Sequence, residues 1–150
     1  SRQPLTGVRA VIARRMSASA FTAPHVTLHT EADATFLVAA RQQINQALAG
    51  EIKLSYNTLL VALVARALHE QQEIAACLIE DEVRIYTDIN IALAVDTERG
   101  LLVPVIRHAD RLDVVAIQQV SDALIQRALA GKSLPEDLTD GVFTMTNLGA

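Results

Sequence analysis

The C-terminal residues of the chain carry two hydroxyl side chains at a spacing that could do chemistry. Apolar and hydroxyl residues alternate from 142 to 147, so Thr144 and Thr146 share one face of an expected strand. Hydroxyls at a strand end can donate hydrogen bonds to a substrate. We interpret this strand as half of a site, whose other half is supplied by another chain or is missing from this one. From spacing alone an ordinary strand is the simpler interpretation, because threonine suits strands.

The four histidines form no complete site by their spacing. His25 and His29 lie four residues apart on an expected strand, about 13 Å, which is too far for one metal ion to bind both. We therefore predict no metal site, and a polar face that contacts solvent or another subunit. His69 and His108 have no serine, cysteine or carboxylate at a spacing typical of a triad. Residues 108–110 are interpreted as a surface turn.

A basic group near the N-terminus could hold an anion. Arg9, Arg14 and Arg15 lie on an expected helix, whose geometry scatters them around its axis. Contacts with solvent or with another subunit explain these arginines at least as well. The single Cys77 rules out an internal disulfide and fits a reducing compartment. It has no neighbouring histidine or basic residue to activate it, so we expect an inert thiol.

The composition argues against two classes of partner and favours a third. A net charge of −4 argues against nucleic acid, because phosphate binding depends on clustered lysine and arginine. The longest strongly apolar stretch, 59–68, is too short to cross a membrane, and Arg66 interrupts it. The chain is 51% hydrophobic but only 3% aromatic, a mix typical of close helix-on-sheet packing or of a large subunit interface. We expect an oligomer.

Hydrophobic periodicity predicts four helices around these groups. Ser55 supplies a start signal, and Gly50 and Gly131 supply two stop signals. The helix that follows Ser55 is apolar nearly all round, so we expect it to be buried. Residues 1–7 are expected to form a linker or an extended arm. The predicted helices span residues 8–20, 35–48, 55–71 and 112–130.

Alternating patterns predict a sheet beside these helices. Residues 26–33 alternate between apolar and polar side chains and are expected to form a half-buried strand. Two apolar strands are joined by a hairpin at 96–100, and Pro104 places the second of them at a sheet edge or a bulge. This mixture favours an α/β two-layer sandwich with a mixed sheet. The other predicted strands span residues 83–87, 89–95, 101–106 and 142–147, with a short turn at 134–138.

Seven short motifs, in a fixed order, resemble one protein family. They run from about residue 8 to residue 150, essentially the whole chain, and their number and order make the resemblance specific. The family is that of the catalytic domains of dihydrolipoamide acyltransferases, the core components of 2-oxo acid dehydrogenase complexes. The motifs are Ile12-Ala-Arg-Arg-Met16, Ala23-Pro-His-Val-Thr-Leu28, Glu31-Ala-Asp33, Asn90-Ile-Ala-Leu-Ala-Val-Asp-Thr97, Gly100-Leu-Leu-Val-Pro-Val-Ile106, Leu134-Pro-Glu-Asp-Leu138 and Gly141-Val-Phe-Thr-Met-Thr-Asn-Leu-Gly149.

The resemblance implies a fold like that of chloramphenicol acetyltransferase, of which residues 8–150 would be an incomplete, N-terminal portion. Homotrimers of this fold build a hollow cubic or dodecahedral core, a 24-mer or a 60-mer. The implied reaction passes an acyl group from S-acyl dihydrolipoamide, carried on a separate lipoyl domain, to coenzyme A. The motifs look most like acetyl-transferring members, from pyruvate or acetoin complexes, with branched-chain acyl groups as an alternative.

The same resemblance implies partners and a location. The partners are the lipoyl domain and the 2-oxo acid dehydrogenase and dihydrolipoamide dehydrogenase components. The location is the bacterial cytoplasm, or alternatively the mitochondrial matrix. The implied site lies between two subunits of the trimer: one supplies a histidine base from a His-x-x-x-Asp-Gly motif, and its neighbour supplies a hydroxyl that matches Thr146 here. We expect Thr146 to stabilise an oxyanion, with Asn147 and Thr144 in support. The candidates for contacts with coenzyme A are Arg14, Arg15 and His25.

The chain departs from the family pattern in two places. No His-x-x-x-Asp-Gly motif occurs, and residues 73–78 lack the usual proline and asparagine. We expect these residues alone to show negligible turnover, because loss of a general base costs about 10²–10⁴-fold in rate. The open alternatives are a non-catalytic assembly protein of the same complex and a small-molecule acyltransferase of the same fold.

Overall fold

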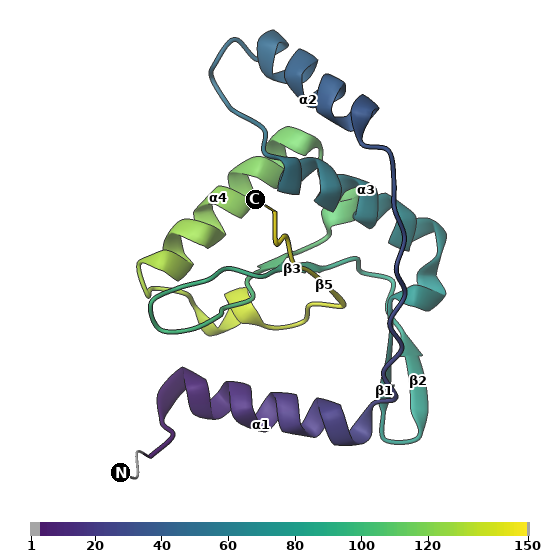
Figure 1. The fold of residues 1–150 in the computed structure, drawn as a ribbon, viewed down its shortest axis with the longest axis vertical. Coiled ribbons are helices and arrows are strands. Elements are labelled where there is room, and N and C mark those ends of the chain that lie inside the picture. The colour runs from purple at the N-terminus through teal and green to yellow at the C-terminus, as the bar shows by residue number, and fades with distance from the viewer. Residues whose placement is uncertain (1–3, 150) are drawn as a thin grey trace.

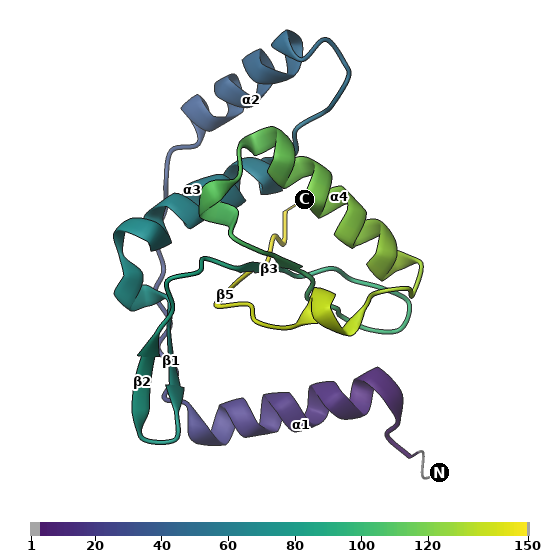
Figure 2. The same ribbon diagram turned by 180° about the vertical axis from the view of Figure 1, so that it is seen from behind.

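The computed structural model describes residues 4–149, so the first three residues of the expected arm and Ala150 lie outside the described part. Two helices, α3 and α4, pack over one face of a small central sheet (Figure 1). The helix α1 lies on the opposite side of that sheet, and the view from behind shows it set apart from the rest of the chain (Figure 2). The polypeptide is therefore built as a packed body with an outlying N-terminal helix.

Two of the helices begin at residues whose side chains cap them. Ser55 Oγ accepts a hydrogen bond from the Thr58 amide (3.1 Å) at the start of α3, and Asp113 accepts one from the Ala116 amide (2.8 Å) at the start of α4. All four predicted helices are confirmed, with ends that differ by two residues at most. The helices are α1 (Gly7–Thr22), α2 (Thr35–Ala47), α3 (Tyr56–Glu70) and α4 (Val114–Leu129), with 3₁₀ turns η1 (Gln72–Ile74), η2 (Ala109–Arg111) and η3 (Pro135–Leu138).

The central sheet of the described residues is mixed. β3 (Ile91–Leu93) lies in the middle, antiparallel to β4 (Val105–Ile106) and parallel to β5 (Phe143–Met145). A bridge across the loop 96–100 confirms the predicted hairpin. β4 is an edge strand, as Pro104 predicted, because proline cannot donate to a ladder.

The core lies between this sheet and helices α3 and α4. Ile91 and Leu93 of β3 belong to the buried cluster, together with residues of both helices such as Val61 and Ile117. α3 differs from the expectation of burial all round. Leu63 is 57% exposed, because only the face of α3 toward α4 and the sheet is covered.

One expected strand is absent from the described residues and one strand was missed. Residues 26–33 form an extended, unpaired stretch between α1 and α2, in which Val26 and Leu28 are 84% and 89% exposed. Alternation predicts extended backbone but cannot supply a pairing partner. The strand β2 (Glu82–Ile85) confirms the prediction for 83–87. Its partner in a separate hairpin, β1 (Ala76–Ile79), was not predicted.

α1 touches the body at the hairpin between β3 and β4. Gly100 there has a φ of +118°, which favours glycine, and a Cβ atom at this position would lie 3.6 Å from Ile12 and 3.8 Å from Val8. No residue of α1 is buried. Contacts of this kind place the helix against the loop without drawing it into the core.

Candidate functional site

β5 turns its hydroxyl residues away from the core. Phe143 and Met145 pack against the buried cluster, while Thr144 is exposed. The Met145 carbonyl accepts a hydrogen bond from the Ala94 amide (3.0 Å), which fixes the last paired residue of the strand. Thr146 follows directly and is also exposed, so it is accessible to a ligand or to another chain.

Asn147 holds the backbone just after Thr146. Its side-chain amide donates a hydrogen bond to Asn57 Oδ1 (2.6 Å), in the first turn of α3. Its Oδ1 accepts a hydrogen bond from the Gly149 amide (2.8 Å). Thr146 therefore lies between a paired strand residue and a residue that is tied to a helix.

The start of α3 is in turn held by both neighbouring helices. Asn45 of α2 donates to and accepts from the backbone of Leu54 (3.1 and 2.7 Å). The buried Gln118 of α4 accepts hydrogen bonds from the Ser55 amide (2.8 Å) and the Thr58 hydroxyl (2.5 Å). The first turn of α3 is thus a rigid support for whatever contacts it.

A cleft of about 410 Å³ lies on the sheet face that points away from α3 and α4. Side chains alternate along β3, so Ala92 faces this cleft, and the register places Val105 and Thr144 beside it. Arg15 of α1 lines the same cleft. The structure therefore brings together Arg15 and Thr144, two candidates named separately from the sequence. A second cleft of about 510 Å³, largely apolar, continues along α1 past Ile12.

The loop before β5 forms one wall of the first cleft. Arg127 of α4 donates two hydrogen bonds to Asp137 (2.7 and 2.9 Å), and the Leu134 amide donates a third (3.0 Å). The Arg127 guanidinium lowers the pKa of the Asp137 carboxyl below its ordinary value of 3.8. At Gly141 a Cβ atom would lie 3.1 Å from Ala92 Cβ, so the loop packs closely on the sheet and a side chain there would need its neighbours to shift by a few tenths of an ångström.

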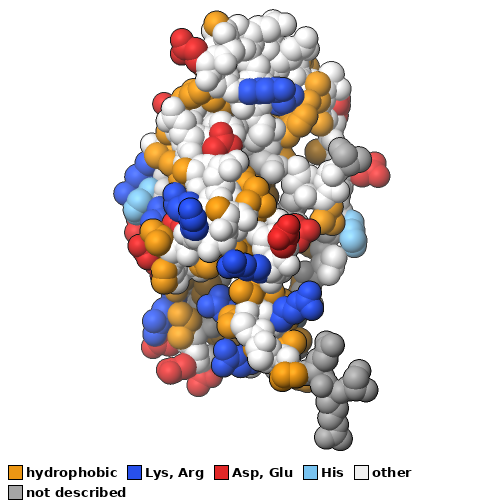
Figure 3. Space-filling view, turned by 90° about the vertical axis from the view of Figure 1, so that its left-hand side faces the viewer, with side chains coloured by type: hydrophobic (Ala, Val, Ile, Leu, Met, Phe, Trp, Pro, Cys, Tyr) orange, Lys and Arg blue, Asp and Glu red, His pale blue; other side chains and the backbone are white. Residues whose placement is uncertain are grey.

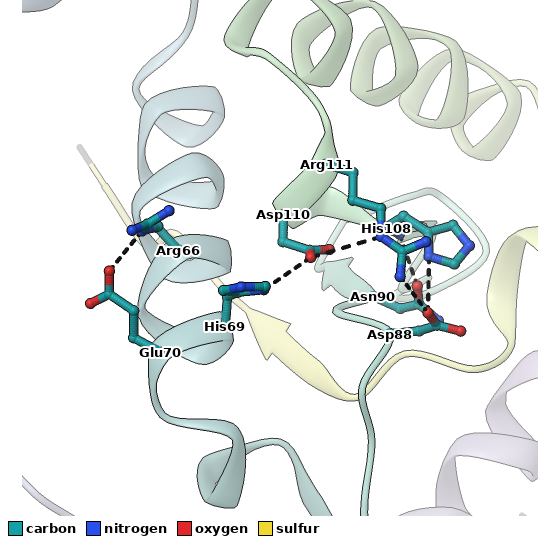
Figure 4. Close-up of polar contacts among 8 residues, drawn as sticks. All are labelled: Arg66, His69, Glu70, Asp88, Asn90, His108, Asp110 and Arg111. Carbon is teal, nitrogen blue, oxygen red and sulfur yellow. Dashed lines mark hydrogen bonds and ion pairs between the residues drawn. The ribbon is translucent and has the colours of Figure 1, made fainter.

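A polar cluster that the sequence analysis missed lies at the start of β3 (Figure 4). His69 Nδ1 lies 3.3 Å from Asp110 Oδ2, and His108 Nδ1 lies 3.3 Å from Asp88 Oδ1. Arg111 also donates a hydrogen bond to Asp88 (3.0 Å). The Asp110 side chain is only 6% exposed, so this turn is less exposed than expected. Sequence spacing holds no signal for these pairs, because their members lie on different elements.

The cluster lies too far from Thr146 to act on it within one chain. Asn57 contacts the residue after Thr146. His69 lies more than three helical turns beyond Asn57 along α3, roughly 18 Å at about 1.5 Å per residue. Asn90 connects the cluster to the loop before β5 instead, since its side chain donates to the Asp140 carbonyl (2.9 Å). The cluster therefore lies at the edge of the sheet where β3 begins and β4 ends, while Thr146 lies past the end of β5.

Two of the candidates for contacts with coenzyme A do not join Arg15. Arg14 is exposed and lines neither of the two clefts above. His25 Nε2 donates a hydrogen bond to the Ser19 carbonyl (3.1 Å) near the end of α1. Within residues 4–149, no group of three or more histidine, cysteine or acidic residues could hold a metal ion. None of the described helices is both long and apolar enough to cross a membrane.

The spacing closest to the missing base motif occurs at His29. Asp33 lies four residues on, but Ala34 follows it in place of glycine. The Asp33 carboxylate is also engaged, because it accepts hydrogen bonds from the Thr35 hydroxyl (2.6 Å) and amide (2.9 Å) at the start of α2. Both bonds lower the pKa of Asp33, and the bond from the Thr35 hydroxyl has the larger effect. His29 lies in an extended stretch, and the carboxylate four residues on is already hydrogen-bonded at the start of α2.

Large apolar side chains are exposed outside the body, and Figure 3 shows hydrophobic residues between basic ones on one face. The chain exposes 11120 Å² of surface, whereas a compact monomer of 16.2 kDa exposes about 7,500 Å². The excess reflects the outlying α1 and the extended stretch after it. Among the exposed residues are Met16, Phe21, Val26, Leu28, Phe36 and Val83.

Relatives of known sequence agree on one family. Residues 1–150 match the family described as 2-oxoacid dehydrogenases acyltransferase (catalytic domain). The chain is 39% identical to the dihydrolipoyllysine-residue acetyltransferase component of the pyruvate dehydrogenase complex of Bacillus subtilis, over 100% of this chain and 35% of that protein. It is 33% identical to the mitochondrial counterpart of Schizosaccharomyces pombe, over 97% of this chain and 30% of that protein. The chain thus spans about a third of the length of these relatives.

Solved structures agree with the sequence relatives. A probable dihydrolipoamide acetyltransferase of Listeria monocytogenes matches with a TM-score of 0.91 and 32% identity, over 99% of this chain and 64% of that one. The dihydrolipoamide acetyltransferase of Azotobacter vinelandii matches with a TM-score of 0.92 and 28% identity, over 99% of this chain and 63% of that one. Its structure was solved to investigate a serine, a histidine and an asparagine in its catalytic mechanism. The cubic core of the pyruvate dehydrogenase multienzyme complex matches with a TM-score of 0.91 and 28% identity, over 99% of this chain and 62% of that one.

These likenesses confirm the expected fold class, a mixed α/β fold with a small mixed sheet of the chloramphenicol acetyltransferase type, present in part. They span almost every residue of the chain, including the loop and strand that present Thr144 and Thr146. The chain belongs to the family of 2-oxoacid dehydrogenase acyltransferase catalytic domains.

Proposed function

We propose that this chain is part of a dihydrolipoamide acyltransferase that passes an acyl group, acetyl by preference, from S-acyl dihydrolipoamide to coenzyme A. In this proposal residues 8–150 are the N-terminal portion of its catalytic domain and residues 1–7 are a linker or an extended arm, whose last residue, Gly7, already belongs to α1. The match of the whole chain to one family supports the reaction. The relatives described above, which are acetyltransferase components of pyruvate dehydrogenase complexes, support the acetyl preference and the proposed partners, the lipoyl domain and the two dehydrogenase components.

The proposed reaction begins at the thiol of coenzyme A. A thiol with an ordinary pKa of about 8.5 is mostly protonated at neutral pH, so a base removes its proton. The thiolate attacks the thioester carbonyl, and negative charge develops on the carbonyl oxygen. The Thr146 hydroxyl donates a hydrogen bond to this oxyanion and stabilises it. The intermediate then expels the dihydrolipoamide sulfur, which takes up the proton held by the base.

The base in this proposal is a histidine of a neighbouring subunit, outside these residues. His69 and His108 each lie beside a carboxylate, but that cluster is at the other end of α3. The exposure of Thr146, which leaves its side chain open to another chain, is the observation that carries the proposed site. Asn147 and Thr144 support it, and Arg15, which shares a cleft with Thr144, is the proposed contact for coenzyme A.

Substitution of Thr146 in the full-length protein tests this function. Thr146→Ala removes the donor, so we expect kcat for acetyl transfer from acetyl-dihydrolipoamide to coenzyme A to fall by about 10²–10³-fold. Thr146→Ser keeps a hydroxyl and should retain most of the activity. Thr87→Ala, at an exposed threonine beyond β2, is the matched control and should leave kcat unchanged. Full activity in Thr146→Ala would contradict the proposed site.

A further inference from the structure

We propose that Asn57, in the first turn of α3, is a positioning residue for acyl transfer, because it fixes the direction of the Thr146 hydroxyl through Asn147. The inference rests on the proposed function of Thr146 and extends it to another element. The hydrogen bond from Asn147 Nδ2 to Asn57 Oδ1 (2.6 Å) is the side-chain link between α3 and the segment that follows β5.

Thr146 needs such a link because it lies beyond the paired part of β5. The Ala94 amide holds the Met145 carbonyl on one side of Thr146. On the other side, Asn147 supplies the next fixed point, through its bonds to α3 and to the Gly149 amide. A hydroxyl stabilises an oxyanion only from a narrow range of positions, and a displacement of about 1 Å at a reacting centre can cost about 10²-fold in rate.

Asn57 is suited to this task because the turn that carries it cannot move freely. Ser55 caps that turn, and the buried Gln118 of α4 holds both Ser55 and Thr58. Asn57 itself is partly buried. The direction of Thr146 is therefore set by the packed helices as well as by the sheet.

The chemistry of the two amides makes the link testable. An aspartate at position 57 still accepts from Asn147 Nδ2, and a negative charge in the first turn of a helix is tolerated well. An aspartate at position 147 still accepts from Gly149, and Asn57 can rotate its amide to donate to it. With aspartate at both positions no donor remains, and two negative charges repel each other.

The experiment compares Asn57→Asp, Asn147→Asp and the double variant in the full-length protein. At about pH 8, where both carboxylates are ionised, we expect each single variant to keep kcat within about threefold of the starting protein. The double variant should lose at least about tenfold in kcat, with KM for coenzyme A and the melting temperature little changed. Asn57→Leu, which has no acceptor, should lose activity that Asn57→Asp retains. If the fold-loss in kcat of the double variant is no larger than the product of the fold-losses of the two single variants, the inference is overturned.

A second measurement separates positioning from a general structural effect. If Asn57 acts through Thr146, the double substitution should lower kcat no further in a Thr146→Ala background. A further loss there would show that the pair acts by another route. Full activity in Thr146→Ala alone would contradict the proposed function itself. If Thr146→Ala lowers kcat but the double variant of Asn57→Asp and Asn147→Asp keeps full activity, only the role of Asn57 is contradicted.

Discussion

At Asp137, one carboxylate joins α4 to the loop that leads into β5. Arg127 and the Leu134 amide supply three hydrogen bonds to it, and the Asp137 side chain is 9% exposed. Hydrogen bonds to the charged form favour that form, which is why the pKa of Asp137 lies below its ordinary value. The ionised Asp137 carboxylate therefore helps to hold the loop that forms one wall of the cleft beside Thr144.

Asp137→Asn should lower the free energy of unfolding by about 1–3 kcal/mol at neutral pH, because it weakens a charged hydrogen-bonded pair. The folded pKa is depressed, so this stability is present above about pH 4 and is lost as the pH falls through the folded value. The gap between the two proteins should thus shrink below pH 4. Urea unfolding at several pH values measures it, with Glu136→Gln, an exposed neighbour, as the control. A gap that stays constant down to pH 2 would contradict this explanation.

The candidate residues differ in how far local sequence could predict them. The exposed faces of Thr144 and Thr146 follow from alternation along one strand, which is a local signal. The contact between Asn57 and Asn147 joins residues 90 positions apart, and the pair of His69 and Asp110 joins residues 41 apart. Spacing cannot reveal such contacts, because packing of distant elements creates them.

At the scale of elements, the junction of α3 and α4 depends on a buried polar side chain. Gln118 accepts two hydrogen bonds from the start of α3 and donates one to Asp122 (2.8 Å) on its own helix. A buried amide with its partners satisfied specifies one arrangement of two helices, whereas apolar contacts alone tolerate sliding.

Gln118→Ala should lower the free energy of unfolding by about 1–3 kcal/mol, since it leaves the Ser55 amide and the Thr58 hydroxyl without their acceptor in a buried place. Gln119→Ala, on the exposed side of the same helix, is the matched control and should change little. Thermal or urea unfolding of both variants tests this. Equal stability of the two would show that the junction is held by apolar packing.

Elements with local signals were predictable, and elements that depend on a partner were not. The four helices were predicted from signals within their own residues, such as recurring apolar positions and the cap at Ser55, and their ends lie within two positions of the prediction. Residues 26–33 alternate as strands do, yet no described strand pairs with them. β1 has no such alternation, and its pairing with β2 makes it a strand. Strand pairing depends on two segments, so the sequence of one segment alone cannot predict it.

At the scale of the molecule, the accessible surface exceeds that of a compact monomer by roughly half. Many of the exposed apolar residues lie on α1, on the stretch after it, on α2 and on the hairpin of β1 and β2. Surface of this kind is typical of subunit interfaces. It supports the homotrimer that the family resemblance implies, as does the likeness to the cubic core.

We expect the full-length protein to have a mass in solution of a trimer or a multiple of it. Leu28→Asp puts a charge on an 89% exposed leucine and should reduce assembly, because an unpaired charge is costly in an interface. Thr27→Asp, at the neighbouring exposed position, is the control. Light scattering coupled to size exclusion measures the masses. A monomer in the unsubstituted protein would contradict the proposed assembly.

The isolation of α1 has a consequence for its own persistence. Helices near 16 residues are only marginally formed in water when nothing packs against them, and α1 buries none of its residues within the chain. We therefore expect the backbone hydrogen bonds of α1 to open more readily than those of α3 and α4, whose residues form part of the core. Arg15 lies on this helix and lines the cleft beside Thr144, so the polar lining of that cleft depends on how well α1 stays folded.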